Sequence, residues 1–495
     1  MVGRRRRLPG TGVGRRLAVG LVLVVLAALL IVPVGRGIDV VRVAPGGDGP
    51  PGRVYVPVAA SPGSSPGVVV AHGFAGSAAL MHTWSLALAH AGFVVVAPDL
   101  PGHGTDMTAP PTDGVEGGLL ASAVLAAADR LRAIPAVDPD RIGLLGHSMG
   151  SGAVLDAAIG EPERFAAAVA VSPTDADVDP TTPRDLLLLA GANESRFVAN
   201  ATSLLERAGG TRGSPGDGDA RALVVIPVVE HVSILFSRTA HDTSIAWLAA
   251  ALDHVPTDEA PVGPLAGWAL LALGILVLWQ ALVVQAATPV AAPTLRSAPW
   301  VALPVGGVAA TASLVIIVRS VDVAAITGLL VAGEVGLWFL MAGAVWLRFG
   351  VRPASPEVRD LGWAALATLT LVGLGATTTL AWAPWWLSGV RVAAAVVLSL
   401  LLLPYSVAAA SLLHGRRGRR AVVAWLATSV AVLVTLGAAA VVVPGLGFLV
   451  LVLPLLPLVL GAVVAVGVGV DRPWASGVAG AVFVGWLLAM LFPLA

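Results

Sequence analysis

Residues 141–152, RIGLLGHSMGSG, decide the fold of the polar part of this chain. An apolar, strand-like run at 142–145 leads into the pattern G-x-S-x-G at 146–150, and a helix-like run follows directly. A serine at a sharp turn between a strand and a helix is held in strained backbone, so its hydroxyl projects clear of the sheet. The N-terminus of the helix then directs N–H groups at any oxyanion that forms nearby. The stretch therefore predicts a nucleophilic serine at Ser148.

Acidic residues are concentrated in one part of the chain. Of 495 residues, 57% are hydrophobic and 12% are charged. Residues 38–260 hold 25 of the 30 Asp and Glu but only 12 of the 30 basic residues, all of which are Arg. The remainder consists of apolar runs of about 20 residues, long enough to cross a hydrocarbon core of about 30 Å. We expect an acidic soluble domain joined to a membrane domain. Because cysteine is absent, disulfides, thiolate catalysis and cysteine-ligated metals are excluded.

The first apolar segment follows a basic tail at 1–16 and occupies 17–34. A cleaved signal peptide is one interpretation, but the sequence lacks a small-x-small cleavage site before residues 35–37. An uncleaved signal-anchor helix is therefore preferred. A soluble domain at 38–257 and a membrane domain at 264–494 are expected to follow. Eight further spans are predicted in the membrane domain, at about 264–286, 299–318, 323–347, 361–382, 390–413, 421–442, 446–469 and 475–494.

The arginine distribution predicts an orientation for these nine spans. Cytoplasmic loops of membrane proteins carry an excess of Lys and Arg. With the N-terminus in the cytoplasm, the loops predicted to be cytoplasmic carry Arg296, Arg348, Arg352, Arg359, Arg416, Arg417, Arg419, Arg420 and Arg472. The loops predicted to be external carry little beyond Arg36, Arg319 and Arg391. The pattern predicts an integral protein of a bacterial plasma membrane with residues 38–257 outside the cytoplasm.

Strand-like and helix-like runs alternate in the soluble region. Strands are predicted at 38–43, 53–58, 67–71, 93–97, 141–145, 166–171, 185–190 and 222–227. Helices are predicted at 77–91, 117–134, 150–160, 195–208 and 236–252. Such an order is typical of an α/β fold with a mostly parallel central sheet.

Two further motifs accompany the serine. The segment 72–77, HGFAGS, follows the third predicted strand, and 99–104, DLPGHG, follows the fourth. In an acyl-transfer site, a turn such as the first supplies a second backbone N–H to the oxyanion hole. Phe74 is the natural candidate, with Met149 as its partner. His103 is interpreted as a scaffold histidine rather than a catalytic one.

The three motifs together, at these spacings, resemble the α/β-hydrolase superfamily of serine hydrolases. The serine-aminopeptidase, monoglyceride-lipase and dienelactone-hydrolase branches are the most similar, and the resemblance covers about residues 38–255. It implies an eight-stranded sheet and a triad in the order Ser, acid, His. Motif-supporting positions are His72, Gly73, Gly146, His147 and Gly150.

The resemblance places the triad acid after the strand at 185–190. Glu194 occupies the position where the family usually has Asp, and the fold accepts Glu; Asp175 or Asp177 is the alternative. The histidine belongs between the last strand and the final helix, where His231 lies. His241 falls inside the following helix and is the weaker candidate. Between the sixth and seventh strands, residues 174–184 leave almost no room for a lid.

The predicted activity is hydrolysis of an ester, less readily an amide, of a lipid or an envelope-associated small molecule. His231 would take the proton of Ser148, and an acyl-enzyme would form. No cofactor, metal or nucleic acid is expected, and the oligomeric state is left open. The alternatives are an acyltransferase on the same scaffold, or an inactive hydrolase-like sensor on a transport or signalling module. Glu334, predicted in the middle of a span, marks either a functional cavity or a hydrogen bond between helices.

Overall fold

The computed structural model describes residues 10–47, 49–109, 116–257, 264–286, 290–296, 298–379, 387 and 389–495. Contacts divide these residues into two compact units. The sheet unit is built on residues 31–257, and the helical unit on 10–30, 265–379 and 389–490. The domain limits drawn from the sequence stay predictions, and most of the basic tail lies outside the described residues.

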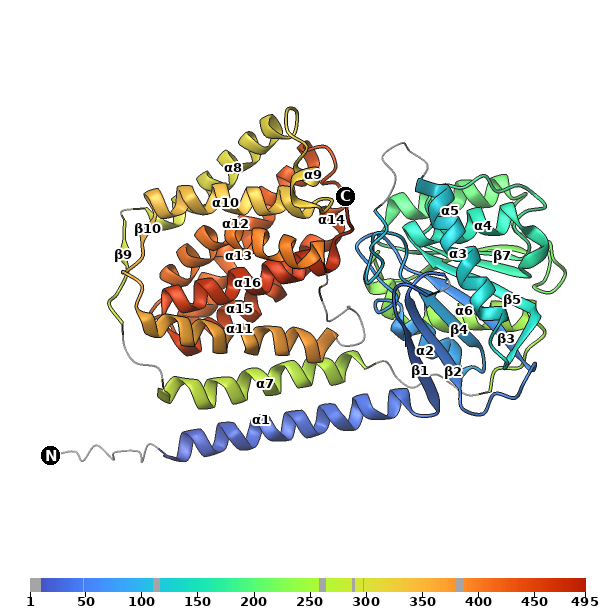
Figure 1. The fold of residues 1–495 in the computed structure, drawn as a ribbon, viewed down its shortest axis with the longest axis horizontal. Helices are drawn as coiled ribbons and strands as arrows, with labels where there is room; N and C mark the ends of the chain where they lie inside the picture. The colour runs from blue at the N-terminus through green and yellow to red at the C-terminus, as the bar shows by residue number, and fades with distance from the viewer. Residues whose placement is uncertain are drawn as a thin grey trace. The chain divides into compact units, whose positions relative to one another are not determined.

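Eight strands form one sheet in the order β1-β2-β4-β3-β5-β6-β7-β8 (Figure 1). They are β1 (Ile38–Val43), β2 (Gly52–Pro57), β3 (Ser65–Ala71), β4 (Val94–Pro98), β5 (Val137–His147), β6 (Ala167–Val171), β7 (Leu186–Gly191) and β8 (Arg221–Ile226). The pairs of β2 with β1 and with β4 are antiparallel, and every other pair is parallel. All eight predicted strands are present, and the α/β-hydrolase architecture expected from the motifs is confirmed.

Helices cover both faces of the sheet. The helices α3 (Glu116–Arg132), α4 (Met149–Gly160) and α5 (Ser195–Arg207) pack on one face, and α2 (His82–His90) and α6 (Arg238–Ala251) on the other. Along β3, Val69 belongs to the first core while Val68 and Val70 belong to the second. Because successive side chains of a strand point to opposite faces, such a strand must be apolar on both. The uninterrupted valines of β3 meet that requirement.

The helix predicted at 77–91 begins five residues later, at His82. Residues 76–80 form turns instead: the Gly76 N–H donates to the Gly73 carbonyl, and Leu80 to Ser77. The Asp99 carboxylate accepts the N–H of Ala78 at 2.7 Å. These bonds hold the start of the segment as a loop, which apolar periodicity alone does not reveal.

Within the described residues, nine helices are long and apolar enough to cross a membrane. They are Gly12–Gly35, Leu265–Val283, Pro299–Ile317, Ala332–Phe349, Val358–Thr377, Val390–Leu413, Arg419–Val442, Leu449–Val470 and Pro473–Leu491. The corresponding elements are α1 (Gly10–Ile31), α7 (Leu265–Ala286), α8 (Pro299–Ile317), α10 (Ala332–Phe349), α11 (Val358–Thr379), α12 (Val390–Leu413), α13 (Arg419–Val442), α14 (Leu449–Val452) together with α15 (Leu456–Val470), and α16 (Pro473–Leu491). Figure 1 shows α1 running beside α7.

The predicted span 323–347 is wrong in its first third. A short helix, α9 (Val323–Thr327), ends at Gly328 with φ +71°, and α10 begins only at Ala332 after Val331 at φ +67°. Positive φ breaks the helical hydrogen-bond ladder, so one apolar run becomes two elements. Glu334 consequently lies in the first turn of α10 rather than in mid-span. A carboxylate is favoured there by the helix dipole.

Candidate active site

Ser148 lies at the turn between β5 and α4, with φ 54° and ψ −123°. A non-glycine residue in this region of backbone space is strained, and the surrounding contacts must impose it. The Ser148 N–H donates to the carbonyl of Val171 on β6 at 2.9 Å. A Cβ on Gly146 would lie 2.1 Å from the Gly150 carbonyl oxygen, and one on Gly150 would lie 2.4 Å from the His72 carbonyl oxygen. Glycine at both positions is therefore what allows the turn to close.

The predicted nucleophile, base and acid form one hydrogen-bonded chain. His231 Nε2 lies 3.1 Å from Ser148 Oγ, and His231 Nδ1 lies 2.9 Å from Glu194 Oε2. All three side chains are buried, at 9%, 3% and 6% exposure for Ser148, His231 and Glu194. The loop after β8 supplies the histidine, and the turn between β7 and α5 supplies the acid. The geometry is that of a nucleophile, a base that can accept its proton, and a carboxylate that orients the base.

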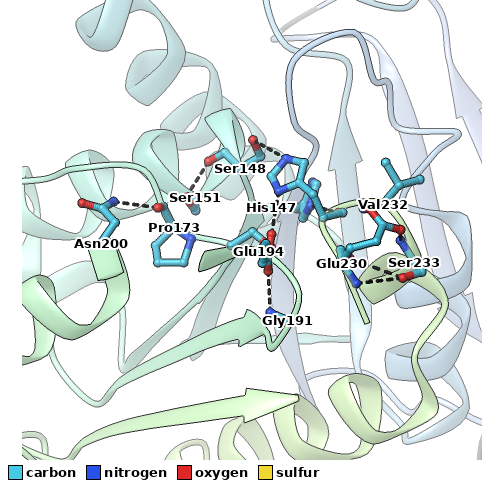
Figure 2. Close-up of polar contacts among 12 residues, drawn as sticks. His147, Ser148, Ser151, Pro173, Gly191, Glu194, Asn200, Glu230, Val232 and Ser233 are labelled. Atoms are coloured by element: carbon cyan, nitrogen blue, oxygen red, sulfur yellow. Dashed lines mark hydrogen bonds and ion pairs between the residues drawn. The ribbon is translucent and has the colours of Figure 1, made fainter. Parts of the chain in front are cut away.

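The second oxygen of Glu194 is held independently of the histidine. Its Oε1 accepts the hydroxyl of Ser172 at 2.7 Å. The same oxygen accepts the N–H of Gly191 at 2.5 Å (Figure 2). A buried carboxylate is costly unless its lone pairs are satisfied. These two donors fix the carboxylate so that Oε2 faces His231. The sequence analysis missed Ser172, which directly follows β6 and carries no motif of its own.

Two rings pack against the His231 imidazole. Phe197 of α5 stacks on it with ring centroids 4.2 Å apart and an interplanar angle of 20°. The ring of His147 lies 4.7 Å away, and its Nε2 is 3.0 Å from the His231 carbonyl oxygen. Since a carbonyl can only accept, His147 is protonated on Nε2. Burial and the nearby His231 lower the pKa of His147 well below its usual value, so the ring is neutral.

The loop after β3 packs directly against the nucleophile. A Cβ on Gly73 would lie 3.0 Å from Ser148 Cβ, which sets the loop of Phe74 beside the serine. His72 secures the loop: its Nδ1 donates to the Gly73 carbonyl at 2.8 Å, and its Nε2 accepts the Leu100 N–H at 3.0 Å. Burial lowers the pKa of His72 to about 4, consistent with a neutral ring that both donates and accepts.

The loop after β4 supports this arrangement from the other side. The Asp99 carboxylate accepts the N–H and the hydroxyl of Thr105 at 2.8 and 2.7 Å. The His103 ring packs edge-on against Phe74, at 5.7 Å between centroids, and its Nδ1 bonds the Pro101 carbonyl at 2.9 Å. His103 thus lies in the scaffold, as predicted. The supporting contacts of Asp99 were missed, although Asp99 stands within the recognised motif.

Met149 is the first residue of α4. The N–H groups of the first helical turn have no acceptor within the helix, so they are available to a ligand at its N-terminus. The N–H of Met149 is therefore available to a ligand at the start of α4. The parts of Met149 and Phe74 in such a hole stay predictions.

The alternative residues lie elsewhere. Asp175 is exposed and pairs with Arg207, and Asp177 is also exposed. His241 lies within α6, where its Nε2 bonds the Leu235 carbonyl at 3.0 Å and its ring packs against Trp84. The described residues between β6 and β7, 172–185, contain neither a helix nor a strand. The absence of a helical lid at this position matches the short segment read from the sequence.

Comparisons with known proteins agree with this fold. The family model described as the alpha/beta hydrolase fold matches residues 66–220. This part of the chain has the α/β-hydrolase fold. A bis(hydroxyethyl) terephthalate hydrolase of Streptomyces coelicolor is 30% identical over 219 residues, and the match covers 43% of this chain and 66% of the relative. The chain thus spans just under two thirds of that relative's length.

Two solved structures resemble the hydrolase domain. An S-formylglutathione hydrolase from Agrobacterium tumefaciens matches with a TM-score of 0.33 at 20% identity, covering 43% of this chain and 95% of that one. A hypothetical protein from Pseudomonas aeruginosa matches with a TM-score of 0.37 at 13% identity, covering 44% and 96%.

Proposed function

We propose that this chain is a membrane-embedded serine hydrolase whose α/β-hydrolase domain cleaves a carboxylic ester through an acyl-enzyme. The observation that carries the proposal is the hydrogen-bonded chain from Ser148 through His231 to Glu194. The name of the Streptomyces relative, a hydrolase of a terephthalate ester, supports the choice of an ester over an amide.

In the proposed reaction, Ser148 Oγ attacks the substrate carbonyl carbon while His231 Nε2 takes the hydroxyl proton. Glu194 Oε2 accepts the Nδ1–H of His231, holds its tautomer and stabilises the imidazolium that forms. The N–H groups of Phe74 and Met149 stabilise the tetrahedral oxyanion. Collapse expels the alcohol, which takes the proton from His231, and water then hydrolyses the acyl-enzyme by the same steps.

We further propose that the domain acts outside the cytoplasm on a lipid or an envelope-associated ester. Support comes from the arginine pattern of the loops and from the nine apolar helices in the described residues. The short segment between β6 and β7 supports an open site that admits a bulky or membrane-bound ester.

The test uses the full chain reconstituted in lipid vesicles and p-nitrophenyl esters of graded acyl length. Wild type should hydrolyse at least one ester, and Ser148→Ala should lower kcat/KM by about 10³-fold or more. Equal rates for the two proteins would refute the assignment of Ser148. Carbonate washing of membranes tests the embedding separately: the chain should stay in the pellet.

A further inference from the structure

A narrow pocket lies within the helical unit, and no residue of the sheet unit lines it. One face of α12 lines it with Leu402, Tyr405, Ser406, Ala409, Ala410 and Leu413. From Arg472, directly before α16, the lining residues recur every four positions into that helix, at Ser476, Gly480 and Val484. A stripe at this spacing follows one side of a helix, so the pocket runs along the helix axes.

The length of the pocket matches one leaflet of a bilayer. From Leu402 to His414, both of which line it, twelve residues of helix rise roughly 18 Å. Half of a typical hydrocarbon core is roughly 15 Å. The pocket therefore extends from one end of the bundle to about the depth of the bilayer centre. Its walls in between are mostly aliphatic, as the surroundings of an acyl chain should be.

The two ends of the pocket differ in polarity. At one end stand His414, Asp471 and Arg472. The Asp471 carboxylate accepts the N–H of Gly415 at 2.8 Å, and Arg472 binds the carboxylate of Asp360 at 2.6 Å. These bonds hold three connecting segments together at this end of the pocket. Together the segments 348–360, 414–420 and 471–472 carry eight arginines against three acids. This end has a net positive charge, which suits an anionic head group.

Two hydroxyl groups in the pocket wall lack partners. Within the described residues, the hydroxyls of Tyr405 and Ser406 make no hydrogen bond, although Tyr405 is only 4% exposed. Neither hydroxyl oxygen is fully buried, so each can donate a hydrogen bond to a ligand carbonyl in the pocket. Both residues line the pocket about 12 to 14 Å along α12 from His414. They are donors placed below the charged end, in a wall that is otherwise apolar.

We propose that this pocket binds one acyl chain of an anionic phospholipid, with the phosphate at the arginine-rich end. Ala409 and Ala410 on α12 and Val464 and Val468 on α15 are only partly buried, so a chain can enter sideways from the bilayer. The site is independent of the Ser148 triad, and it depends on the membrane embedding proposed above. A lipid held there would stabilise the packing of α12 against α15 and α16.

The experiment uses the full chain in vesicles of phosphatidylcholine doped with a lipid carrying a diazirine in its acyl chain. The probe is either phosphatidylglycerol or phosphatidylcholine, and mass spectrometry maps the cross-links. We expect the phosphatidylglycerol probe to label residues of α12 and α15 in the pocket at least fivefold more than the phosphatidylcholine probe. Ala409→Trp, which fills the pocket, should abolish most of that labelling.

Matched variants separate the possible outcomes. Val434→Trp, on an exposed position of α13 outside the pocket, should leave the labelling unchanged. The double variant Arg416→Gln and Arg417→Gln should bring the two probes to similar labelling. Arg319→Gln, which lies just after the C-terminus of α8 and outside the pocket, should leave the preference for phosphatidylglycerol unchanged. Val464→Phe is a second variant that fills the pocket, for use if Ala409→Trp is not monodisperse.

Labelling spread evenly over lipid-facing positions, or unchanged by both pocket-filling variants, would overturn the proposal. Equal labelling by both probes in wild type would overturn the anionic head group.

Discussion

The carboxylate of Glu194 has one oxygen fixed by Ser172 and Gly191 and the other on His231. Replacing Glu194 with Gln puts a neutral amide against an imidazole that becomes positively charged during the reaction. We expect kcat for a p-nitrophenyl ester to fall by about 10³- to 10⁴-fold.

The matched control for this variant is Asp175→Asn. Asp175 is exposed and pairs with Arg207, so its replacement should change kcat less than about twofold. If Asp175→Asn were the damaging change and Glu194→Gln the harmless one, the assignment of the acid would be wrong.

Buried neutral histidines make the stability of the hydrolase domain dependent on pH. Burial lowers the pKa of His72 and His241 to about 4 and that of His82 to about 3. In the unfolded chain these groups titrate near 6.5. Between about pH 4 and 6.5 the unfolded state therefore binds more protons, and the free energy of unfolding falls as pH is lowered through this window.

Each histidine contributes up to about 1.4 kcal/mol per pH unit to that slope. Hydrogen exchange of the β3 and α6 peptides in the intact chain, measured at pH 7 and pH 5, should show the loss. His241→Phe, outside the triad, should reduce the slope by one histidine's share. An unchanged slope would mean that His241 is not the neutral buried group described.

The juxtaposition of Ser148, His231 and Glu194 could be predicted because each follows a strand in a recognisable order. Ser172, Phe197 and Asp99 could not, for different physical reasons. Ser172 and Phe197 contact Glu194 and His231 only after β6, β7 and α5 have packed together. Asp99 accepts the backbone N–H of Ala78, which lies 21 residues away in another loop, and no local pattern encodes that contact.

At the scale of elements, close helix packing depends on individual glycines. A Cβ on Gly343 of α10 would lie 2.2 Å from the backbone nitrogen of Tyr405 on α12, so Gly343→Ala must push these helices apart. We expect a loss of about 1–3 kcal/mol in stability. Thermal unfolding in detergent measures it.

Gly373 of α11 supplies the control, because an added Cβ there meets nothing within 4 Å. Gly373→Ala should be neutral or stabilising by up to about 1 kcal/mol, through the higher helix propensity of alanine. Equal destabilisation by both variants would contradict the described packing of α10 on α12.

The elements that the sequence predicted least well are those shaped by loop hydrogen bonds or positive φ. The predicted start of α2 and the predicted span at 323–347 both failed where a turn interrupts an apolar run. Apolar periodicity reports which residues are buried, and a run interrupted at Gly328 and Val331 stays apolar on both sides of the break.

At the scale of the whole molecule, the orientation in the membrane is open to a direct test because the chain has no cysteine. Ser203→Cys on α5 and Ser355→Cys between α10 and α11 both place a thiol at an exposed position. In intact cells an impermeant maleimide should label the first variant at once and the second only after permeabilisation. The opposite pattern would place the hydrolase domain in the cytoplasm.

The central claim is that Ser148 is the nucleophile of this membrane-embedded hydrolase, and a covalent adduct tests it most directly. The reconstituted full chain is treated with a fluorophosphonate, digested with trypsin, and the peptide of residues 142–164 is fragmented, since it also holds Ser151. We predict one phosphonate on Ser148, absent from Ser148→Ala and strongly slowed in Glu194→Gln. A folded wild-type chain that takes up no phosphonate, or takes it up at another serine, would contradict the claim.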